Sequence, residues 1–312
     1  MSEQPLHLKY RPRTFDEFLG NESIIESLES ILSREEGIPH SFLFYGPSGC
    51  GKTTLARIIA SKLGCSDKEY YEYNVADVRG IDTIRDIIYQ CKFAPLVGKV
   101  KVYVLDEFHQ STKDAQNAIL KILEDTPKHV YFILCTTEPE KILKTIRTRC
   151  TSFQLSPLPR PKLIRLLKYV CKQEGVELPK EAYQEIAKAS GGGPRQALVI
   201  LDSVIDIEDD DKLLEAIQGF CPSDVQVTDI CKVLLDFRKS PELKWKEVSK
   251  ILQGMKEDHE QVRYMILSYL SKVLLGKTDD RIAEMLGLFQ ESFMYTGKAG
   301  LIYNLYLACK IK

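Results

Sequence analysis

Length, composition and charge already narrow the classes of protein to which this chain can belong. Its 312 residues are enough for more than one domain with its own core, and 44% hydrophobic with 28% charged residues is typical of globular proteins. No apolar run approaches the ~18 residues of a transmembrane helix, and the N-terminus lacks a secretory pattern, so no membrane attachment is expected. The formal net charge of −1 implies that any contact with nucleic acid uses basic residues gathered on one face or supplied by several copies.

The cysteines indicate a reducing compartment. All nine are scattered, their number is odd, and no C-x-x-C pair occurs among them. We therefore expect a cytoplasmic protein with no disulfide framework and no zinc site.

The first informative segment is Gly46–Thr53, which fits the phosphate-loop pattern G-x-x-x-x-G-K-[ST]. The apolar run 42–45 before it predicts a buried strand, and 55–60 after it reads as a helix. Glycines let the backbone N–H groups surround an anion, and a helix N-terminus adds partial positive charge there. Lys52 is expected to reach the β- and γ-phosphates of a nucleotide, and Thr53 to hold Mg²⁺.

About fifty residues further along, the β-rich run 101–105 ends in Asp106 and Glu107. Asp106 at the strand tip is expected to hold Mg²⁺, mainly through water. Glu107 would orient or deprotonate an attacking water. An ordinary surface pair at a strand end is the alternative, and the phosphate loop upstream disfavours it.

The next β-run, 131–135, ends in Thr136 and Thr137. If this strand lies between the two site strands, a hydroxyl at its tip can sense the γ-phosphate. Arg149 follows shortly before the last strand, and an arginine can stabilise a transferring phosphoryl group, often from a neighbouring subunit. Taken alone, Arg149 would more simply form a surface salt bridge.

The alternation of elements predicts the fold class. Between residues 41 and 153, short β-runs alternate with amphipathic helices, which indicates a parallel α/β sheet covered on both faces. Helices follow over 161–175, 179–189 and 194–206, then an acidic helix entry at 208–211, and the remainder is helical. We expect three domains: 1–156, a nucleotide-binding core; 157–221, a small helical lid; and 222–312, an all-α domain suited to oligomerisation.

Several motifs give the chain a close resemblance to the clamp-loader branch of the AAA+ ATPases. This branch includes bacterial γ/τ-type subunits, small subunits of replication factor C, and phage counterparts. Segment 9–20 resembles its N-terminal box, 74–81 a motif at the start of a DNA-facing helix, and 105–109 and 118–124 the bacterial subunits. Thr148-Arg149-Cys150 stands at the Ser-Arg-Cys position, and 193–197 at the sensor-2 helix.

The resemblance implies roles for individual residues. Glu107, Lys52 and, acting in trans on the next subunit's ATP, Arg149 are the catalytic candidates, with Mg²⁺ held by Thr53 and Asp106. The candidates for binding ATP are Tyr10, Pro12, Gly46, Ser48, Gly49, Cys50, Gly51, Lys52, Thr53, Thr54, Thr137 at sensor 1 and Arg195 at sensor 2. The candidates for contacting DNA, all near expected helix starts, are Arg79, Arg85, Thr112 and Lys113.

It also implies partners and a mechanism. Loaders of this family are pentamers that open a sliding clamp and close it on primer–template DNA, and ATP hydrolysis releases the closed clamp. Two departures stand out, because the chain lacks the four-cysteine zinc module common in bacterial γ/τ subunits and their further C-terminal tail. The expected setting is the cytoplasm of a bacterium or of a virus-infected cell, and the nucleus only for a eukaryotic chain.

Three other functions stay open at the level of sequence. The chain could be a non-hydrolysing structural subunit of the same loader, although its motifs are complete. It could be another AAA+ machine, such as a branch-migration motor or an unfoldase, although the 9–20 box argues against this. A phosphotransferase acting on a small molecule would need neither the C-terminal helical domain nor an arginine that serves a neighbour.

Overall fold

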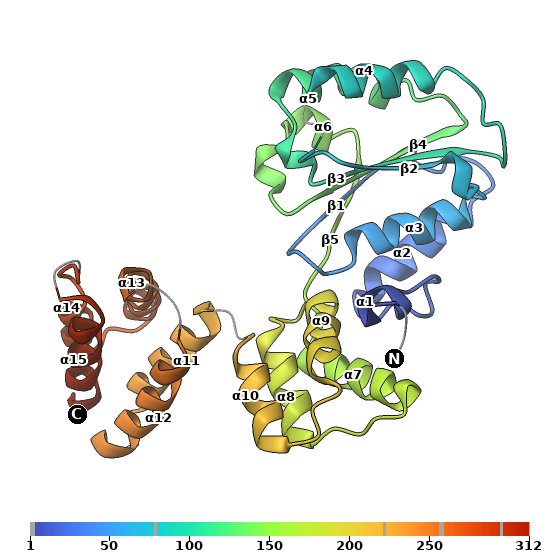
Figure 1. Cartoon of the computed structure of the whole chain (residues 1–312). Helices are drawn as coiled ribbons and strands as arrows, with labels where there is room; N and C mark the ends of the chain where they lie inside the picture. Colours follow the sequence, from blue (N-terminus) through green and yellow to red (C-terminus); the bar gives the residue numbers. More distant parts are fainter. Residues whose placement is uncertain (1–3, 78–79, 221–222, 256–258, 294–295, 312) are drawn as a thin grey trace. The chain divides into compact units, whose positions relative to one another are not determined.

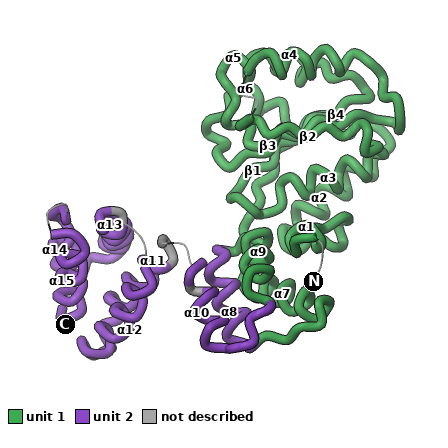
Figure 2. The backbone as a smooth tube through the Cα atoms, in the orientation of Figure 1, with its two compact units in different colours: residues 1–178, 192–205 green, residues 179–191, 206–312 purple. Residues whose placement is uncertain are grey.

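The structure, a computed structural model, describes residues 4–77, 80–220, 223–255, 259–293 and 296–311 (Figure 1). The chain forms two compact units (Figure 2). Unit 1 contains residues 1–178 and 192–205, and unit 2 contains residues 179–191 and 206–312.

Unit 1 is built on a five-stranded sheet with the order β2-β3-β4-β1-β5, in which every neighbouring pair is parallel. Its strands are β1 (Ser41–Tyr45), β2 (Tyr70–Asn74), β3 (Lys101–Asp106), β4 (Val130–Thr136) and β5 (Thr151–Gln154). This confirms the predicted parallel α/β core. It also places β4 between β3 and β1, the strands that precede the two carboxylates and the phosphate loop.

Helices cover both faces of the sheet, with α4, α5 and α6 on one side and α2 and α3 on the other (Figure 1). The helices of unit 1 are α1 (Leu6–Lys9), α2 (Glu22–Leu32), α3 (Lys52–Lys62), α4 (Ile81–Gln90), α5 (Lys113–Glu124), α6 (Lys144–Arg147), α7 (Arg160–Glu174) and α9 (Pro194–Val204). Short 3-10 turns occur at η1 (Asp67–Glu69), η2 (Phe108–Gln110) and η3 (Pro139–Lys141).

The side chains of β1 show why its sequence is apolar throughout. Phe42 and Phe44 pack into the core between the sheet and α3. Leu43 packs into the core on the opposite face, with α4 and α5. Successive residues of a strand point to opposite faces, and here both faces are buried. The run 42–45 therefore needs apolar residues at every position rather than at alternate ones.

Unit 2 is entirely helical within its described residues. Its helices are α8 (Lys180–Ala189), α10 (Asp210–Gln218), α11 (Ser223–Leu235), α12 (Pro241–Gly254), α13 (His259–Gly276), α14 (Asp280–Leu288) and α15 (Gly297–Lys310). Helices α11 to α15 enclose one apolar core that includes Leu234, Val248, Ile266 and Leu305. The acidic helix entry predicted at 208–211 is confirmed, because the Asp209 carboxylate accepts a hydrogen bond from the N–H of Lys212 at the start of α10.

The helices predicted over 157–221 divide between the units, since α7 and α9 belong to unit 1 and α8 and α10 to unit 2. The domain boundaries at residues 156 and 221 remain predictions. None of the helices in the described part of the chain is long and apolar enough to span a bilayer.

Candidate nucleotide site

The loop after β1 has a backbone that only glycine can supply at two positions. Gly46 has φ +145°, and a Cβ there would stand 2.3 Å from the carbonyl oxygen of Leu155. Gly51 has φ +98°, and its Cβ would stand 2.8 Å from the ring of Phe18. A side chain at either position would meet a steric clash in addition to an unfavourable φ.

Lys52 is the first residue of α3 and its side chain is buried within the loop. Its Nζ donates hydrogen bonds to the carbonyl oxygens of Gly46, at 2.9 Å, and Pro47, at 3.0 Å. The ammonium group therefore lies at the N-terminus of a helix, beside backbone that can surround an anion. Thr53 is half-buried next to it.

The two carboxylates lie at the tip of β3, as predicted. Asp106 ends the strand, and its Oδ1 accepts a hydrogen bond from the backbone N–H of Glu107 at 3.0 Å. Burial raises the pKa of the Asp106 carboxyl, the nearby Glu107 charge raises it further, and the Lys52 ammonium opposes this. A cation at this carboxylate would offset the cost of its burial.

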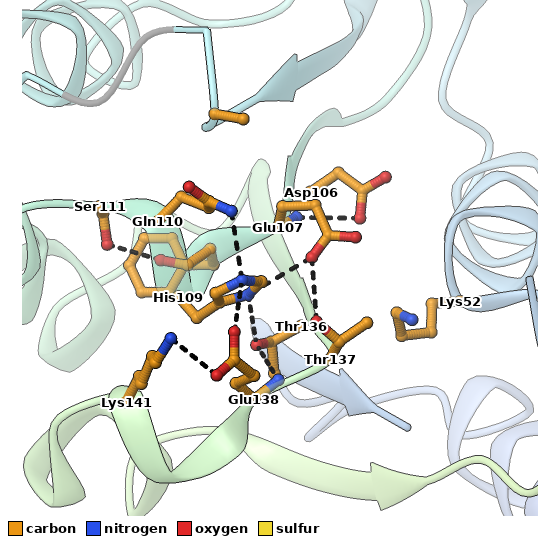
Figure 3. Close-up of polar contacts among 12 residues, drawn as sticks. Lys52, Asp106, Glu107, His109, Gln110, Ser111, Thr136, Thr137, Glu138 and Lys141 are labelled. Carbon is orange, nitrogen blue, oxygen red and sulfur yellow. Dashed lines mark hydrogen bonds and ion pairs between the residues drawn. The ribbon is translucent and has the colours of Figure 1, made fainter. Parts of the chain in front are cut away.

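Glu107 has a left-handed backbone, with φ 50° and ψ 42°. Such a conformation is uncommon for a residue with a side chain and is found more often at functional sites. Its Oε2 accepts a hydrogen bond from Oγ1 of Thr137 at 3.3 Å and lies 3.3 Å from Nδ1 of His109 (Figure 3). The carboxylate is thus held by groups from η2 and from the end of β4.

Thr137 follows β4 directly, so its position depends on the order of the strands. Because β4 separates β3 from β1, the tip of β4 lies between the carboxylates and the phosphate loop. Figure 3 shows Lys52, Thr137, Glu107 and Asp106 near one another. The sheet therefore brings together residues from three separate parts of the sequence.

Arg195 approaches the same loop from α9. A Cβ built at Gly49 would lie 3.7 Å from the Cβ of Arg195, which is exposed at the second position of the helix. Ser48 of the loop is exposed as well, whereas Cys50 is buried.

The N-terminal box is anchored to the elements around the loop. The Tyr10 hydroxyl donates a hydrogen bond to Glu174 of α7, and burial together with the Glu174 charge raises the pKa of Tyr10 to about 12. Arg11 Nε donates to Oγ1 of Thr54 in α3 at 3.1 Å. Pro12, the residue after Arg11, is half-buried.

Arg149 contacts other groups. Its guanidinium donates to Glu124 at the end of α5, with Nε 2.8 Å from Oε1, and to the carbonyl oxygen of Thr145 at 2.8 Å. The family resemblance predicts that Arg149 acts in the ATP site of a neighbouring subunit rather than in that of its own. Within this chain its partners are the end of α5 and the residues of α6.

The four residues expected to contact DNA lie in different settings. Arg79 falls outside the described residues. Arg85 lies in the second turn of α4 rather than at its start, because the helix begins at Ile81, and it pairs with Asp82 at 3.2 Å. Thr112 is the N-cap of α5, where its Oγ1 accepts a hydrogen bond from the N–H of Ala115 at 3.2 Å, and Lys113 is exposed at the first helical position.

Sequence reasoning gave no role to His109, Glu138 and Arg11, although each makes a polar contact with or next to a predicted site residue. His109 stands two positions after Glu107, and this spacing is the one signal that could have drawn attention to it. Glu138 directly follows Thr137 and Arg11 stands between Tyr10 and Pro12, but their contacts with His109 and Thr54 are long-range, so spacing does not reveal them.

Together, the phosphate loop after β1, the carboxylates at the tip of β3, which β4 separates from β1, and the helices α7 and α9 define an AAA+ nucleotide-binding module. RuvB of Thermotoga maritima, a Holliday junction branch migration motor, has the same fold: two of its solved structures, one of them of a mutant, cover 77% of this chain with TM-scores of 0.56 and 0.58 at 23% and 22% identity. The match covers 85% and 86% of the two RuvB chains. At this level of sequence identity, the similarity shows the fold alone.

Comparisons of sequence show which AAA+ proteins the chain resembles most. Residues 74–159 match the family model described as "DNA polymerase III, delta subunit", and residues 165–205 match "RCF1/5-like, AAA+ ATPase lid domain". The τ subunit of Bacillus subtilis DNA polymerase III is 33% identical over 304 residues, which are 89% of this chain and 53% of that protein. The γ/τ subunit of Mycobacterium bovis is 35% identical over 223 residues, 64% of this chain and 38% of the relative.

The chain is therefore related to the γ/τ subunits of DNA polymerase III and carries an AAA+ lid of the RCF1/5-like kind. It spans 38% of the Mycobacterium bovis γ/τ subunit, 53% of the Bacillus subtilis τ subunit and 61% of the γ subunit of Buchnera aphidicola, so it covers only part of each relative.

Proposed function

We propose that this chain is an ATPase motor subunit of a loader that places a sliding clamp on primer–template DNA. The observation that carries the proposal is the site at the edge of the sheet. Lys52 lies in the phosphate loop, Asp106 and Glu107 lie at the tip of β3, and Thr137 lies between them at the end of β4. The family relationship to the γ/τ subunits supports the rest of the proposal.

ATP is the substrate to which this site is best suited. The backbone of Gly46–Gly51 and the ammonium of Lys52 provide donors for the β- and γ-phosphates. Arg195 from α9 and Thr137 would contact the γ-phosphate. Tyr10 and Pro12 belong to the box that would pack near the adenine.

The donor set at the β3 tip fits Mg²⁺, which prefers hard oxygen ligands and keeps much of its water shell. Thr53 and Asp106 would hold the ion, and burial of the Asp106 carboxyl favours a cation there. When bound, Mg²⁺ would neutralise charge on the phosphate oxygens.

Glu107 acts as the general base in this proposal. Its carboxylate accepts the proton of a water that attacks the γ-phosphate, and Thr137 holds one of its oxygens. Arg149 would complete the ATP site of the neighbouring subunit, since its partners within its own chain are Glu124 and Thr145. Hydrolysis would then depend on assembly.

The larger assembly follows from the family. Residues 157–221 would form the lid and residues 222–312 a collar that joins subunits in a pentamer, in several copies or with distinct partners.

Lys113 is the strongest of the DNA-contact candidates, because it is exposed at the start of α5. Contacts of this kind read the phosphate backbone, so binding should follow DNA structure rather than sequence. The cytoplasm is the setting that suits this work in a bacterium or an infected cell.

The decisive experiment measures ATP hydrolysis with a candidate clamp, primed DNA and partner subunits. We expect clamp and primed DNA together to stimulate hydrolysis, and Glu107→Gln to abolish it while ATP still binds. Branched junction DNA is the matched control, because a branch-migration motor would respond to it instead. Stimulation by neither clamp nor primed DNA would overturn the proposal, and a wild-type chain that binds ATP without hydrolysing it would favour a structural subunit.

A further inference from the structure

His109 connects the proposed base to a second carboxylate. Its side chain is 6% exposed and follows Glu107 by two residues, within η2. The ring nitrogen Nδ1 lies 3.3 Å from Glu107 Oε2 and 3.1 Å from Thr136 Oγ1 (Figure 3). On the other side, Nε2 lies 3.1 Å from Glu138 Oε1.

Glu138 is itself held in place. Its Oε2 lies 2.7 Å from Nζ of Lys141, and its backbone N–H donates to Thr136 Oγ1 at 3.0 Å. The hydrogen bond from Lys141 lowers the pKa of the Glu138 carboxyl, so this group is an acceptor at neutral pH. Both ring nitrogens of His109 thus face carboxylate oxygens, and the ring donates to both when it carries a proton on each nitrogen, which fixes its plane and the direction of Nδ1.

Glu107 needs such a partner because the hydrogen bond from Thr137 alone does not fix its carboxylate. Its side chain is 31% exposed and has several rotatable bonds, and its backbone already occupies a strained region. A base that is misplaced by about 1 Å can lose ~100-fold in rate, so a group that fixes its carboxylate affects catalysis directly.

We propose that His109 is a positioning residue for ATP hydrolysis, which holds the Glu107 carboxylate through Nδ1 while Glu138 orients the ring through Nε2. This inference rests on the proposed ATPase function and adds to it a contact on which the base depends. The competing explanation is that the ring only fills space beside Thr136.

Asparagine and glutamine substitutions separate these explanations. The amide nitrogen of asparagine is as many bonds from Cβ as Nδ1 is, whereas that of glutamine matches Nε2. His109→Asn can therefore still donate toward Glu107, while His109→Gln reaches toward Glu138 instead. A ring that only fills space would make the larger glutamine at least as good a replacement.

The test compares kcat, KM and ATP affinity for these variants and for His109→Ala. We expect kcat to fall ~10- to 100-fold in H109A and H109Q, and only a few-fold in H109N, with ATP affinity unchanged in all three. His129→Asn is the matched control, since His129 lies near the carbonyl oxygens of Cys91 and Phe93, outside the site, and its kcat should stay at the wild-type value.

Two results would overturn the inference: H109A hydrolysing ATP at the wild-type rate, or H109N losing as much activity as H109A. Rescue by H109N also shows that a loss in H109A does not come from failure to fold. A wild-type chain without hydrolysis under any condition would overturn the proposed function and this inference together. An active wild-type chain with an active H109A overturns this inference alone.

Discussion

Gly46 shows how much the phosphate loop depends on one missing side chain. Its positive φ would strain any other residue, and the carbonyl oxygen of Leu155 occupies the space that a Cβ would need. Gly37 also has a positive φ, +78°, but nothing lies within 4 Å of its Cβ position. The two glycines therefore separate backbone strain from steric overlap.

We predict that Gly46→Ala lowers the free energy of unfolding by about 2–5 kcal/mol, the sum of a positive-φ penalty and an overpacking cost. Gly37→Ala should carry only the penalty of about 1–2 kcal/mol. Urea unfolding followed by far-UV circular dichroism measures both values. Equal losses in the two variants would mean that Leu155 moves aside readily and that the overlap has no energetic weight.

At the scale of elements, apolar runs and their spacing were enough to predict the strands. The runs 42–45, 101–105 and 131–135 lie within β1, β3 and β4, because a parallel sheet buried on both faces requires apolar residues at every position. The carboxylates and Thr137 could be placed because each directly follows such a run.

The contacts of His109 could not be predicted in the same way. They depend on the left-handed turn at Glu107 and on the pairing of β4 with β3, which brings Thr136 and Glu138 alongside η2. The start of α4 at Ile81 agrees with the motif at 74–81, whereas the pairing of Arg85 with Asp82 could not be predicted from that motif. Local sequence thus predicts elements better than it predicts the side-chain contacts between them.

The start of α14 offers a test of electrostatics within one element. The Asp279 carboxylate accepts a hydrogen bond from the N–H of Arg281 at 3.1 Å and pairs with its guanidinium at 2.9 and 2.8 Å. These contacts with Arg281 lower the pKa of Asp279 from 3.8 to about 2. The folded state thus lowers the pKa of Asp279. The carboxylate therefore contributes fully to stability above its ordinary pKa of 3.8, and this contribution is lost as the pH falls toward 2.

We therefore predict that the carboxyl carbon of Asp279 titrates with a midpoint near 2 in a carbon NMR experiment. Asp279→Asn keeps a capping side chain without the charge, so it should be less stable than the wild type at pH 7 and close to it at the acid limit. Asp279→Ala should be the least stable of the three, because it loses the cap as well. A midpoint at the ordinary value would show that Arg281 does not hold this carboxylate in solution.

At the scale of the whole molecule, the proposed function divides the catalytic groups between copies. Glu107 and Lys52 lie in the site at the sheet edge, whereas Arg149 is held by Glu124 and Thr145. Helix α15 exposes Ile302, Tyr303 and Tyr306 while its other side packs into the core of unit 2, which suits a domain that joins subunits. Hydrolysis by an isolated copy should then be slow for lack of a partner's arginine.

Mixing two inactive variants tests this division. We predict that Arg149→Ala and Glu107→Gln each lower kcat at least ~100-fold in the assembled protein, since an arginine supplied in trans is worth about 10³ or more in related phosphoryl transfers. In an equal mixture, an Arg149→Ala subunit keeps an intact Glu107 and can receive Arg149 from a Glu107→Gln neighbour. Random assembly forms this arrangement at about a quarter of the sites, so activity should return to about a quarter of the wild-type rate, measured as phosphate release. If the mixture is as inactive as each variant alone, Arg149 acts in the site of its own subunit. In that case no combination of the two variants contains a complete site.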